Sequence, residues 1–431
     1  MAIETDMRIS DIHISPVAVP DPPLLNAAGL HAPYALRLII EIVGADGMSG
    51  WGEIPGSEAT RLALELAAER IIGMDPWGLN AIFAELDALA NPDDRGATPW
   101  DQRAWVHVKS AIEVACYDLM GKSIGRPVVD LLGGAARDRV PFAAYLFYKY
   151  EGAGGEFGFG RDEAATGWTA ARQEAALGPE GIVAQAQAMV DNYGFKSIKL
   201  KGGAFEPQVE VDSILALREA FGPDVPLRLD PNAIWRVDTA IAAGVQLEGI
   251  LEYYEDPVRG QANMGTVARE VDIPLATNMC TTSFDDLPGS IAHQSEAIIL
   301  SDHHFWGGFR ASLDLARFCA VFDRGLSMHS NSHLGISLAA MVHLAAAVPN
   351  LSYDCDTHYP WQDGHDLLIK PLQIEDGAVE LPRAPGLGIE VDRDKLAQLQ
   401  ANYTACGLTE RNDEVEMQKV QPGWSFQSTR W

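Results

Sequence analysis

Two lysines lie inside a short apolar segment, SIKLKGG, which the sequence otherwise predicts to be a buried strand. Ile198 and Leu200 alternate with Lys199 and Lys201, so the two-residue repeat of a strand directs both ammonium groups to one face. Burial and like-charge repulsion both disfavour a protonated lysine. The pattern therefore predicts that each lysine lowers the pKa of the other, which leaves Lys201, at the strand end, as a neutral amine able to act as a base.

Polar residues end a whole series of apolar segments. Eight residues share this position: Tyr145, Lys201, Asp230, Glu255, Asn278, Asp302, His329 and His358. From the second onward they are 23 to 29 residues apart, which is the length of one β/α unit. A polar residue after a strand is often only a helix cap. A run of them with complementary chemistry favours an active site at the mouth of a parallel barrel.

Three of these residues offer only oxygen donors from successive strands, namely Asp230, Glu255 and Asn278. Hard oxygen donors beside room for water favour Mg²⁺ over Zn²⁺, with Mn²⁺ as a possible substitute. The alternative is a group of helix caps or an ion-pair network. His329 and His333 have the spacing of a helical zinc pair. Because His329 ends a strand, we disfavour a two-histidine zinc site.

His329 and Asp302 end adjacent predicted strands. A carboxylate in that place can orient the imidazole and raise its basicity. The alternative is two unrelated capping groups. With Lys201 opposite, two bases would flank a divalent cation, and Lys199 would tune Lys201 and contact an anionic group. This arrangement suits abstraction of a proton α to a carboxylate while the cation stabilises the enediolate.

The elements that must position these residues form two patterns. Residues 1–135 combine strand-like segments such as ALRLIIEIVG with helical periodicity, which predicts an α+β unit. After residue 140, apolar strands alternate with helical segments; the strand candidates are VPFAAYLFY, SIKLK, VPLRLD, GILEYYED, IPLATN, AIILSD, GLSMHS and LSYDCDT. Eight β/α units in about 220 residues predict an α/β fold with a closed (β/α)8-type barrel.

Composition excludes several classes of protein. The chain has 431 residues and a formal net charge of −28, so nucleic acid and anionic membranes are poor partners, and an anionic ligand needs a local positive site. Five scattered cysteines without a CxxC pair disfavour a disulfide framework or zinc ribbon. Without a signal peptide or an apolar stretch of about 18 residues, we expect a cytoplasmic protein.

Motifs along nearly the whole chain resemble the glucarate dehydratase subgroup of the enolase superfamily. They are GLHAPYALR, GWGEIPGSE, AAYLFYKY, FKSIKLKGG, LDPNAIW, EDP, LATNMCTT, DHHFWGG, MHSNSHLGISLA, DTHYPWQDG and GLTERNDEVEMQKVQPGW. KLKGG together with ATNM is highly specific, because other branches of the superfamily usually present a third metal ligand other than Asn. One departure is a family threonine in the loop 95–103, displaced here to Thr98 or Pro99.

The resemblance implies roles for individual residues. Lys201 would be one general base and His329, paired with Asp302, the other, with Lys199 and Asn232 assisting. The Mg²⁺ ligands would be Asp230, Glu255 and Asn278. The positions that match substrate contacts are His31, Tyr145, Lys199, Asn232, Asn278, Ser330, Asn331, His358 and Arg411.

The resemblance also implies an architecture and an activity. Residues 1–135 would form a capping domain whose loop with His31 closes over the mouth of a barrel at 136–364, and the segment 365–431 would return to the capping domain and bring Arg411. The expected reaction is Mg²⁺-dependent dehydration of D-glucarate, or a close aldarate, to 5-keto-4-deoxyglucarate, in a homo-oligomer that binds this small dicarboxylate. Rival interpretations are dehydration of another aldaric or aldonic acid, a Schiff-base aldolase with Lys201 as nucleophile, and a non-catalytic barrel.

Overall fold

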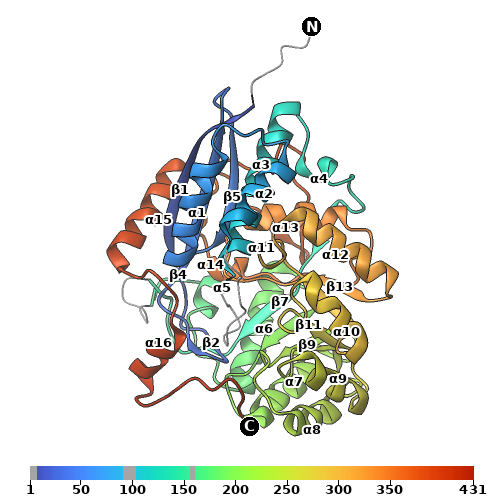
Figure 1. The fold of residues 1–431 in the computed structure, drawn as a ribbon. Coiled ribbons are helices and arrows are strands. Elements are labelled where there is room, and N and C mark those ends of the chain that lie inside the picture. Colours follow the sequence, from blue (N-terminus) through green and yellow to red (C-terminus); the bar gives the residue numbers. More distant parts are fainter. Residues whose placement is uncertain (1–6, 91–102, 156–160) are drawn as a thin grey trace.

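An antiparallel sheet with its helices covers one side of a curled parallel sheet, which is surrounded by further helices (Figure 1). The computed structural model describes residues 7–90, 103–155 and 161–431. None of the helices within these ranges is long and apolar enough to cross a membrane. The predicted α/β architecture with a separate capping domain is therefore present.

The capping domain begins with a sheet in the order β1-β4-β5. Its strands and the small hairpin in the β1–β4 connection are β1 (Ile9–Pro20), β2 (Leu25–Asn26), β3 (Gly29–Leu30), β4 (Tyr34–Gly44) and β5 (Ser49–Pro55). Its helices are α1 (Glu58–Ile71), α2 (Leu79–Leu89), α3 (Ala104–Ile124) and α4 (Val128–Leu131). Ser57 caps α1 by accepting a hydrogen bond from the backbone N of Thr60 (3.1 Å), which fixes where that helix starts.

Helix α3 packs directly against β5 because two glycines remove the side chains between them. A Cβ atom at Gly50 would lie 2.0 Å from the carbonyl oxygen of Ala115, and one at Gly52 would lie 2.4 Å from that of Ala111. The backbone of the helix thus touches the strand, and a separate apolar core fills the space around this contact. The same close packing holds β5, which carries Glu53, at the boundary with the barrel.

The parallel sheet has the order β13-β12-β11-β10-β9-β8-β7. Its strands are β7 (Ala144–Phe147), β8 (Ile198–Lys201), β9 (Leu227–Asp230), β10 (Leu251–Glu255), β11 (Leu275–Thr277), β12 (Ile298–Ser301) and β13 (Gly325–Met328). Their register brings the carboxyl ends together, because Lys201 pairs with Phe147 on one side and Asp230 on the other. All four residues of β8 are buried, as the alternating pattern predicts.

The predicted eighth strand, LSYDCDT, is not a regular strand. Cys355 exchanges backbone hydrogen bonds with Pro141 and Ala143 on one side (2.9 Å each), and Asp356 donates to the carbonyl of Met328 on the other (2.8 Å). The segment therefore closes the barrel through single hydrogen bonds to the residues before β7 and to the end of β13, and not through the continuous strand pairing that was expected. The fold class is as predicted, but the eighth position is occupied by an irregular segment.

Helices cover the outside of this sheet and connect its strands. They are α5 (Gly167–Ala171), α6 (Pro179–Tyr193), α7 (Pro207–Phe221), α8 (Val237–Leu247), α9 (Gln261–Glu270), η1 (Phe284–Asp286), α10 (Leu287–His293), α11 (His303–Trp306), α12 (Phe309–Val321), α13 (Gly335–Ala347) and α14 (Tyr359–Gln362). Helix α13 is buried along its entire length, because it lies between the barrel and the capping domain and contacts β5.

The C-terminal segment lies beside the capping domain, where Figure 1 shows the red helices next to the blue strands. Its elements are β14 (Ile374–Glu375), β15 (Ala378–Glu380), α15 (Arg393–Cys406) and α16 (Asp413–Val420), together with β6 (Arg139–Pro141), which pairs with β15. Helix α15 packs on β1, and α16 packs on β3. We propose domain boundaries at 135/136 and 364/365 on this basis.

Candidate active site

Most of the predicted site residues gather around one cavity of about 70 Å³ at the carboxyl ends of the parallel strands. Ten of them line it: His31, Tyr145, Lys201, Asn232, Asn278, His329, Ser330, Asn331, His358 and Arg411. The other four, which contact this lining, are Lys199, Asp230, Glu255 and Asp302. The structure therefore brings together residues that are as far apart in sequence as the capping loop and the C-terminal segment.

Lys199 is fully buried among carboxylates. Its Nζ lies 2.5 Å from Oε2 of Glu255 and 2.6 Å from Oδ2 of Asp356, above the ring of Tyr145. Burial lowers the pKa of Lys199, whereas the negative charges of Asp356 and Glu255 raise it. The charges outweigh burial, so the pKa of Lys199 lies well above its ordinary value. The predicted mutual lowering of the two lysine pKa values is therefore wrong for Lys199. The sequence analysis missed Asp356, which supplies the compensating charge.

Lys201 differs from Lys199 in its access to the cavity. Its side chain is 10 % exposed, whereas that of Lys199 is 0 % exposed, and its Nζ lies 2.6 Å from Oδ2 of Asp230. Of the two lysines, only Lys201 lines the cavity. It is therefore the lysine that can reach a bound molecule.

The predicted oxygen donors lie at the ends of β9 and β10 and directly after β11. Asp230 accepts a hydrogen bond from the backbone N of Asn232 (2.9 Å), and the amide of Asn278 donates to Oε1 of Glu255 (3.0 Å). Burial, and then the charge of Asp230, raise the pKa of Glu255 well above its usual value. Two adjacent buried carboxylates with an amide oxygen fit a hard divalent cation such as Mg²⁺.

His333, four residues after His329, makes a contact of its own. No group of three or more His, Cys, Asp or Glu side chains in the described ranges is arranged to hold a metal ion. Nε2 of His333 lies 3.0 Å from Oγ1 of Thr357.

His329 and Asp302 form a hydrogen-bonded pair, with 2.9 Å between Nδ1 and Oδ2. Asp302 is also the N-cap of α11, because its Oδ1 accepts the backbone N–H of His304 (2.7 Å). Burial raises the pKa of Asp302, but the hydrogen bond and charge of His329 lower it more, so the net shift is downward. An ionised carboxylate only accepts, so Nδ1 of His329 donates its N–H to Asp302, and Nε2 is the ring nitrogen available for proton transfer.

Arg411 lines the cavity, but its Nε and Nη2 atoms are bound to Asp413 (2.7 and 2.6 Å). Asp413 also accepts from the amide of Asn26 (2.6 Å). Gly29 has φ +131°, and a Cβ there would lie 2.3 Å from the carbonyl oxygen of Asp413. The capping loop with His31 is therefore packed against the C-terminal segment. Asp413 therefore occupies the Nε–Nη2 edge of the Arg411 guanidinium, while Arg411 still lines the cavity.

Several residues at the site were missed. Phe147, Phe305, Asn26 and Ser332 line the same cavity, and Asp356 holds Lys199. For Asp356 a signal existed, because two buried lysines require buried carboxylates and DCDT lies just before His358. Asn26 gave no signal, since its place depends on the packing of the capping loop. Thr98 and Pro99, noted as the site of a departure, lie outside the described residues.

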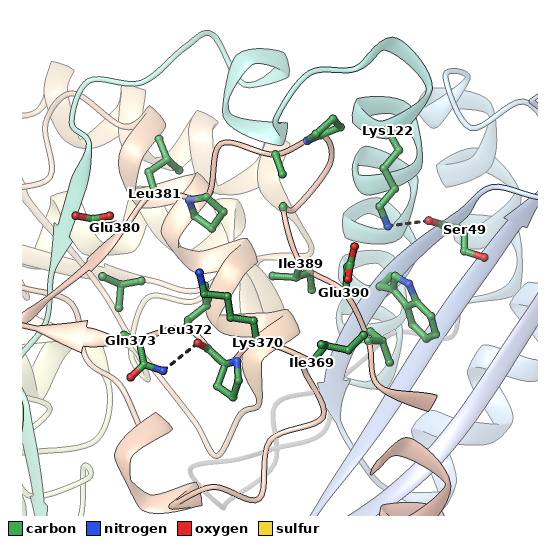
Figure 2. A pocket seen from close by; sticks show the side chains of 18 of the residues that line it. Ser49, Lys122, Ile369, Lys370, Leu372, Gln373, Glu380, Leu381, Ile389 and Glu390 are labelled. Carbon is green, nitrogen blue, oxygen red and sulfur yellow. Dashed lines mark hydrogen bonds between the residues drawn. The ribbon is translucent and has the colours of Figure 1, made fainter. Parts of the chain in front are cut away.

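A much larger cavity, of about 1020 Å³, lies elsewhere, between β5 and α3 of the capping domain and residues 369–393 (Figure 2). Figure 2 shows Lys122 donating to the backbone oxygen of Ser49 (2.9 Å) at its edge. None of the fourteen predicted site residues is among its described lining. We identify the site by its converging chemistry, since the size of a cavity alone does not distinguish the two.

Comparison with known families gives two matches. Residues 12–133 match the mandelate racemase / muconate lactonizing enzyme N-terminal domain, and residues 181–395 match the enolase C-terminal domain-like family. A curated relative is a "Probable glucarate dehydratase" from Streptomyces coelicolor, 43% identical, covering 99% of each chain. A D-galactarolactone cycloisomerase from Agrobacterium fabrum is 28% identical and covers 87% of this chain and 94% of its own.

Solved structures are also similar over the whole chain. An enolase from Mycobacterium smegmatis complexed with tartrate has a TM-score of 0.90 and 48% identity and covers 100% of both chains. An enolase from Pseudomonas fluorescens with bound magnesium, potassium and tartrate has a TM-score of 0.91 and 44% identity, covering 98% of this chain and 99% of that one.

Proposed function

The chain belongs to the enolase superfamily, and we propose that it is a Mg²⁺-dependent hydro-lyase that dehydrates an acid sugar, with D-glucarate or a close aldarate as substrate. One observation carries the proposal. Lys201 and His329, the two candidate bases, line the same cavity as Asn278, a member of the oxygen-donor set. The similar glucarate dehydratase and the similar structures that hold magnesium and tartrate support it.

Asp230, Glu255 and Asn278 would hold Mg²⁺, since they offer three oxygen donors from neighbouring strand ends. When bound, Mg²⁺ supplies positive charge that stabilises the enediolate form of the substrate carboxylate. The chain itself supplies the fixed geometry: Asn278 is oriented by Glu255, and Asp230 is oriented by the backbone of Asn232.

The proton transfers would be divided between Lys201 and His329. One of them removes the proton α to the carboxylate, and the C–H electron pair moves toward that carboxylate. The pair then forms the carbon–carbon double bond as the C–O bond at the β position breaks. His329 gives a proton to the departing hydroxide, which leaves as water. That proton is the α-proton when His329 is the base, and when Lys201 is the base His329 must enter the step as an imidazolium, which Asp302 stabilises. The enol product tautomerises to the keto diacid.

Lys201 and His329 would also permit proton removal from either epimer at the reacting carbon, so some epimerisation should accompany dehydration. The hydroxyl groups of the substrate would meet polar side chains around the cavity, which are His31, Tyr145, Asn232, Ser330 and His358. Of these, Ser330 and His358 are already oriented toward each other, with 3.1 Å between Oγ and Nδ1. Lys199 would act through charge, beneath the reacting carboxylate.

The test is incubation of the purified, Mg²⁺-loaded protein with a panel of aldaric and aldonic acids and lactones, followed by mass spectrometry. A dehydratase gives a product lighter by one water, whereas a cycloisomerase leaves the mass unchanged. Borohydride added during turnover would trap a Schiff-base aldolase covalently. Release of a keto diacid from an aldarate supports the proposal, and isomerisation, covalent trapping or no reaction across the panel would reject it.

A further inference from the structure

We propose that Arg37, from strand β4 of the capping domain, is a positioning residue that sets the direction of the hydrogen bonds behind His329. The inference rests on the proposed function, because it concerns the base whose proton transfer that function requires. Arg37 lines a separate cavity of about 80 Å³ next to the site. Its hydrogen bonds, however, are made with Glu53 and with Asn331 of the barrel. Its side chain is only 2 % exposed.

Arg37 joins the two domains at their buried boundary. Its Nε donates to Oε1 of Glu53 (2.8 Å), and its Nη1 donates to Oδ1 of Asn331 (2.8 Å). Glu53 in turn accepts the backbone N–H groups of Leu334 (2.7 Å) and Ser337 (2.9 Å), at the start of α13. The pair is therefore anchored to the loop that carries His329, Ser330 and Asn331, and to the helix that follows it.

The chemistry of Arg37 determines how the amide of Asn331 is turned. A guanidinium has five donors and no acceptor, so the group facing it must be the amide oxygen. The amide nitrogen then faces Nδ1 of His304 (3.2 Å) and Oδ2 of Asp302 (3.4 Å). His304 must accept at Nδ1 and carry its proton on Nε2, which lies 3.0 Å from the carbonyl oxygen of Glu53.

The series of hydrogen bonds that starts at Arg37 and runs through Asn331 and Asp302 ends at His329. Oδ2 of Asp302 receives the Asn331 amide and Nδ1–H of His329, so both groups favour an ionised carboxylate and leave Nε2 of His329 as the base. If the amide of Asn331 were reversed, its oxygen would face that carboxylate and oppose its charge. Arg37 prevents the reversal, although it touches neither His329 nor Asp302 through a hydrogen bond.

The experiment measures exchange of the α-proton with solvent deuterium for D-glucarate and for its epimer at the reacting carbon. The exchange lost in His329→Ala defines the reaction of that base, and the exchange lost in Lys201→Ala defines the other. We expect Arg37→Gln to slow the His329-dependent exchange roughly 10- to 100-fold, part of the ~10²- to 10⁴-fold that a general base contributes. The Lys201-dependent exchange should change less than about 3-fold, and Arg37→Lys, still only a donor, should restore most of the loss.

A matched control uses another arginine that joins the same two domains. Arg310 on α12 forms an ion pair with the buried Glu113 on α3, away from His329. Arg310→Gln should affect stability without separating the two exchange reactions. Because Arg37→Gln leaves Glu53 buried without its partner, the double variant Arg37→Gln/Glu53→Gln serves where the single variant does not fold.

Coupling to Asn331 provides the second measurement. If Arg37 acts through that amide, Arg37→Gln should add less than about 3-fold to the effect of Asn331→Ala on the His329-dependent exchange. Wild-type protein that exchanges neither epimer would reject the proposed function itself. Wild-type exchange of both epimers, with equal losses of both in Arg37→Gln or in its double variant, would overturn the role of Arg37 alone, as would full additivity with Asn331→Ala.

Discussion

The two sides of the candidate site are built in different ways. On the lysine side, Lys199 and Lys201 lie among three buried carboxylates, all from the barrel. On the histidine side, one carboxylate, that of Asp302, pairs with His329. The neutral side chains of Asn331 and His304 beside it are held in place by Arg37 and Glu53 of the capping domain. The lysine side is thus organised by charge within one sheet. The histidine side is organised by the direction of hydrogen bonds across two domains.

This difference predicts which perturbations affect the whole site and which affect one side. Removal of the metal should have the largest effect, because two carboxylates of the lysine side, Asp230 and Glu255, are proposed ligands and the bound cation serves both bases. We expect dehydration and both exchange reactions to disappear in EDTA and to return with Mg²⁺ or Mn²⁺. The check is to measure the activity and the metal content of the same sample, first after EDTA treatment and again after Mg²⁺ or Mn²⁺ is returned. Full activity in protein shown to be metal-free would contradict the mechanism.

Removal of each base should separate the two sides. Lys201→Ala and His329→Ala should each lower the rate of dehydration by about 10²- to 10⁴-fold, the usual contribution of a general acid or base. Each should abolish deuterium exchange with one epimer only, as followed by NMR in D₂O. Either single variant that retained both exchange reactions would show that Lys201 and His329 are not opposed bases.

Neutralising the carboxylate behind His329 should produce a weaker form of the same lesion. Asp302→Asn keeps the shape but removes the charge that orients Nδ1 and stabilises the imidazolium, so we expect a loss of roughly 10- to 1000-fold. The loss should fall on the epimer that depends on His329. Glu252→Gln is a suitable control, because Glu252 pairs with Arg228 inside the barrel (2.7 Å) and does not contact His329. If Asp302→Asn slowed exchange equally for both epimers, Asp302 would support the folded structure as a whole and not His329 specifically.

The two sides also differ in what the sequence reveals. Lys201, Asp230 and Asp302 were predicted because strand ends repeat at the length of a β/α unit, and backbone geometry then brings them together. Asp356 was missed although two buried lysines require buried carboxylates, because it lies two residues before His358, the residue taken as the end of the predicted eighth strand. Arg37 was given no role because it is separated from Asn331 by 294 residues. A contact of that kind depends on how two domains pack, which no local pattern encodes.

Acid should destabilise the folded protein through its buried histidines. Burial lowers the pKa of His107 and of His333 from 6.5 to about 3. Between about pH 6.5 and pH 3, both imidazoles are therefore neutral in the folded protein but protonated in the unfolded chain. Their contribution to the free energy of unfolding is complete above about pH 6.5 and is lost as the pH falls toward 3. Two protons taken up on unfolding correspond to about 2.7 kcal/mol per pH unit.

Thermal unfolding midpoints measured between neutral pH and about pH 4 test this expectation. His333→Gln should reduce the dependence on pH by about one proton, because glutamine does not titrate, while its amide can still meet Oγ1 of Thr357. A wild-type midpoint that is constant over this range would contradict the assignment of these histidines as neutral.

The smallest effect is expected at Arg411, which lies at the far edge of the cavity from the barrel. An aldarate has a second carboxylate, and an open guanidinium fork would bind it strongly. Because Asp413 already takes Nε and Nη2, a ligand gains only part of that interaction. We therefore expect Arg411→Ala to lower kcat/KM for an aldarate by about 3- to 30-fold, corresponding to one charge-assisted contact.

The comparison of a diacid with the corresponding mono-acid sugar separates the two possible roles of Arg411. If Arg411 contacts the distal carboxylate, the loss should be confined to the diacid, because the mono-acid has no charge at that end. If Arg411 only holds Asp413 and the capping loop, kcat/KM should fall equally for both substrates. The thermal midpoint should also fall, because Asp413 is left buried without its charged partner. Arg411→Lys keeps the charge without the fork. A mono-acid that loses as much as the diacid would therefore assign Arg411 to the support of the capping loop and reopen the choice of substrate.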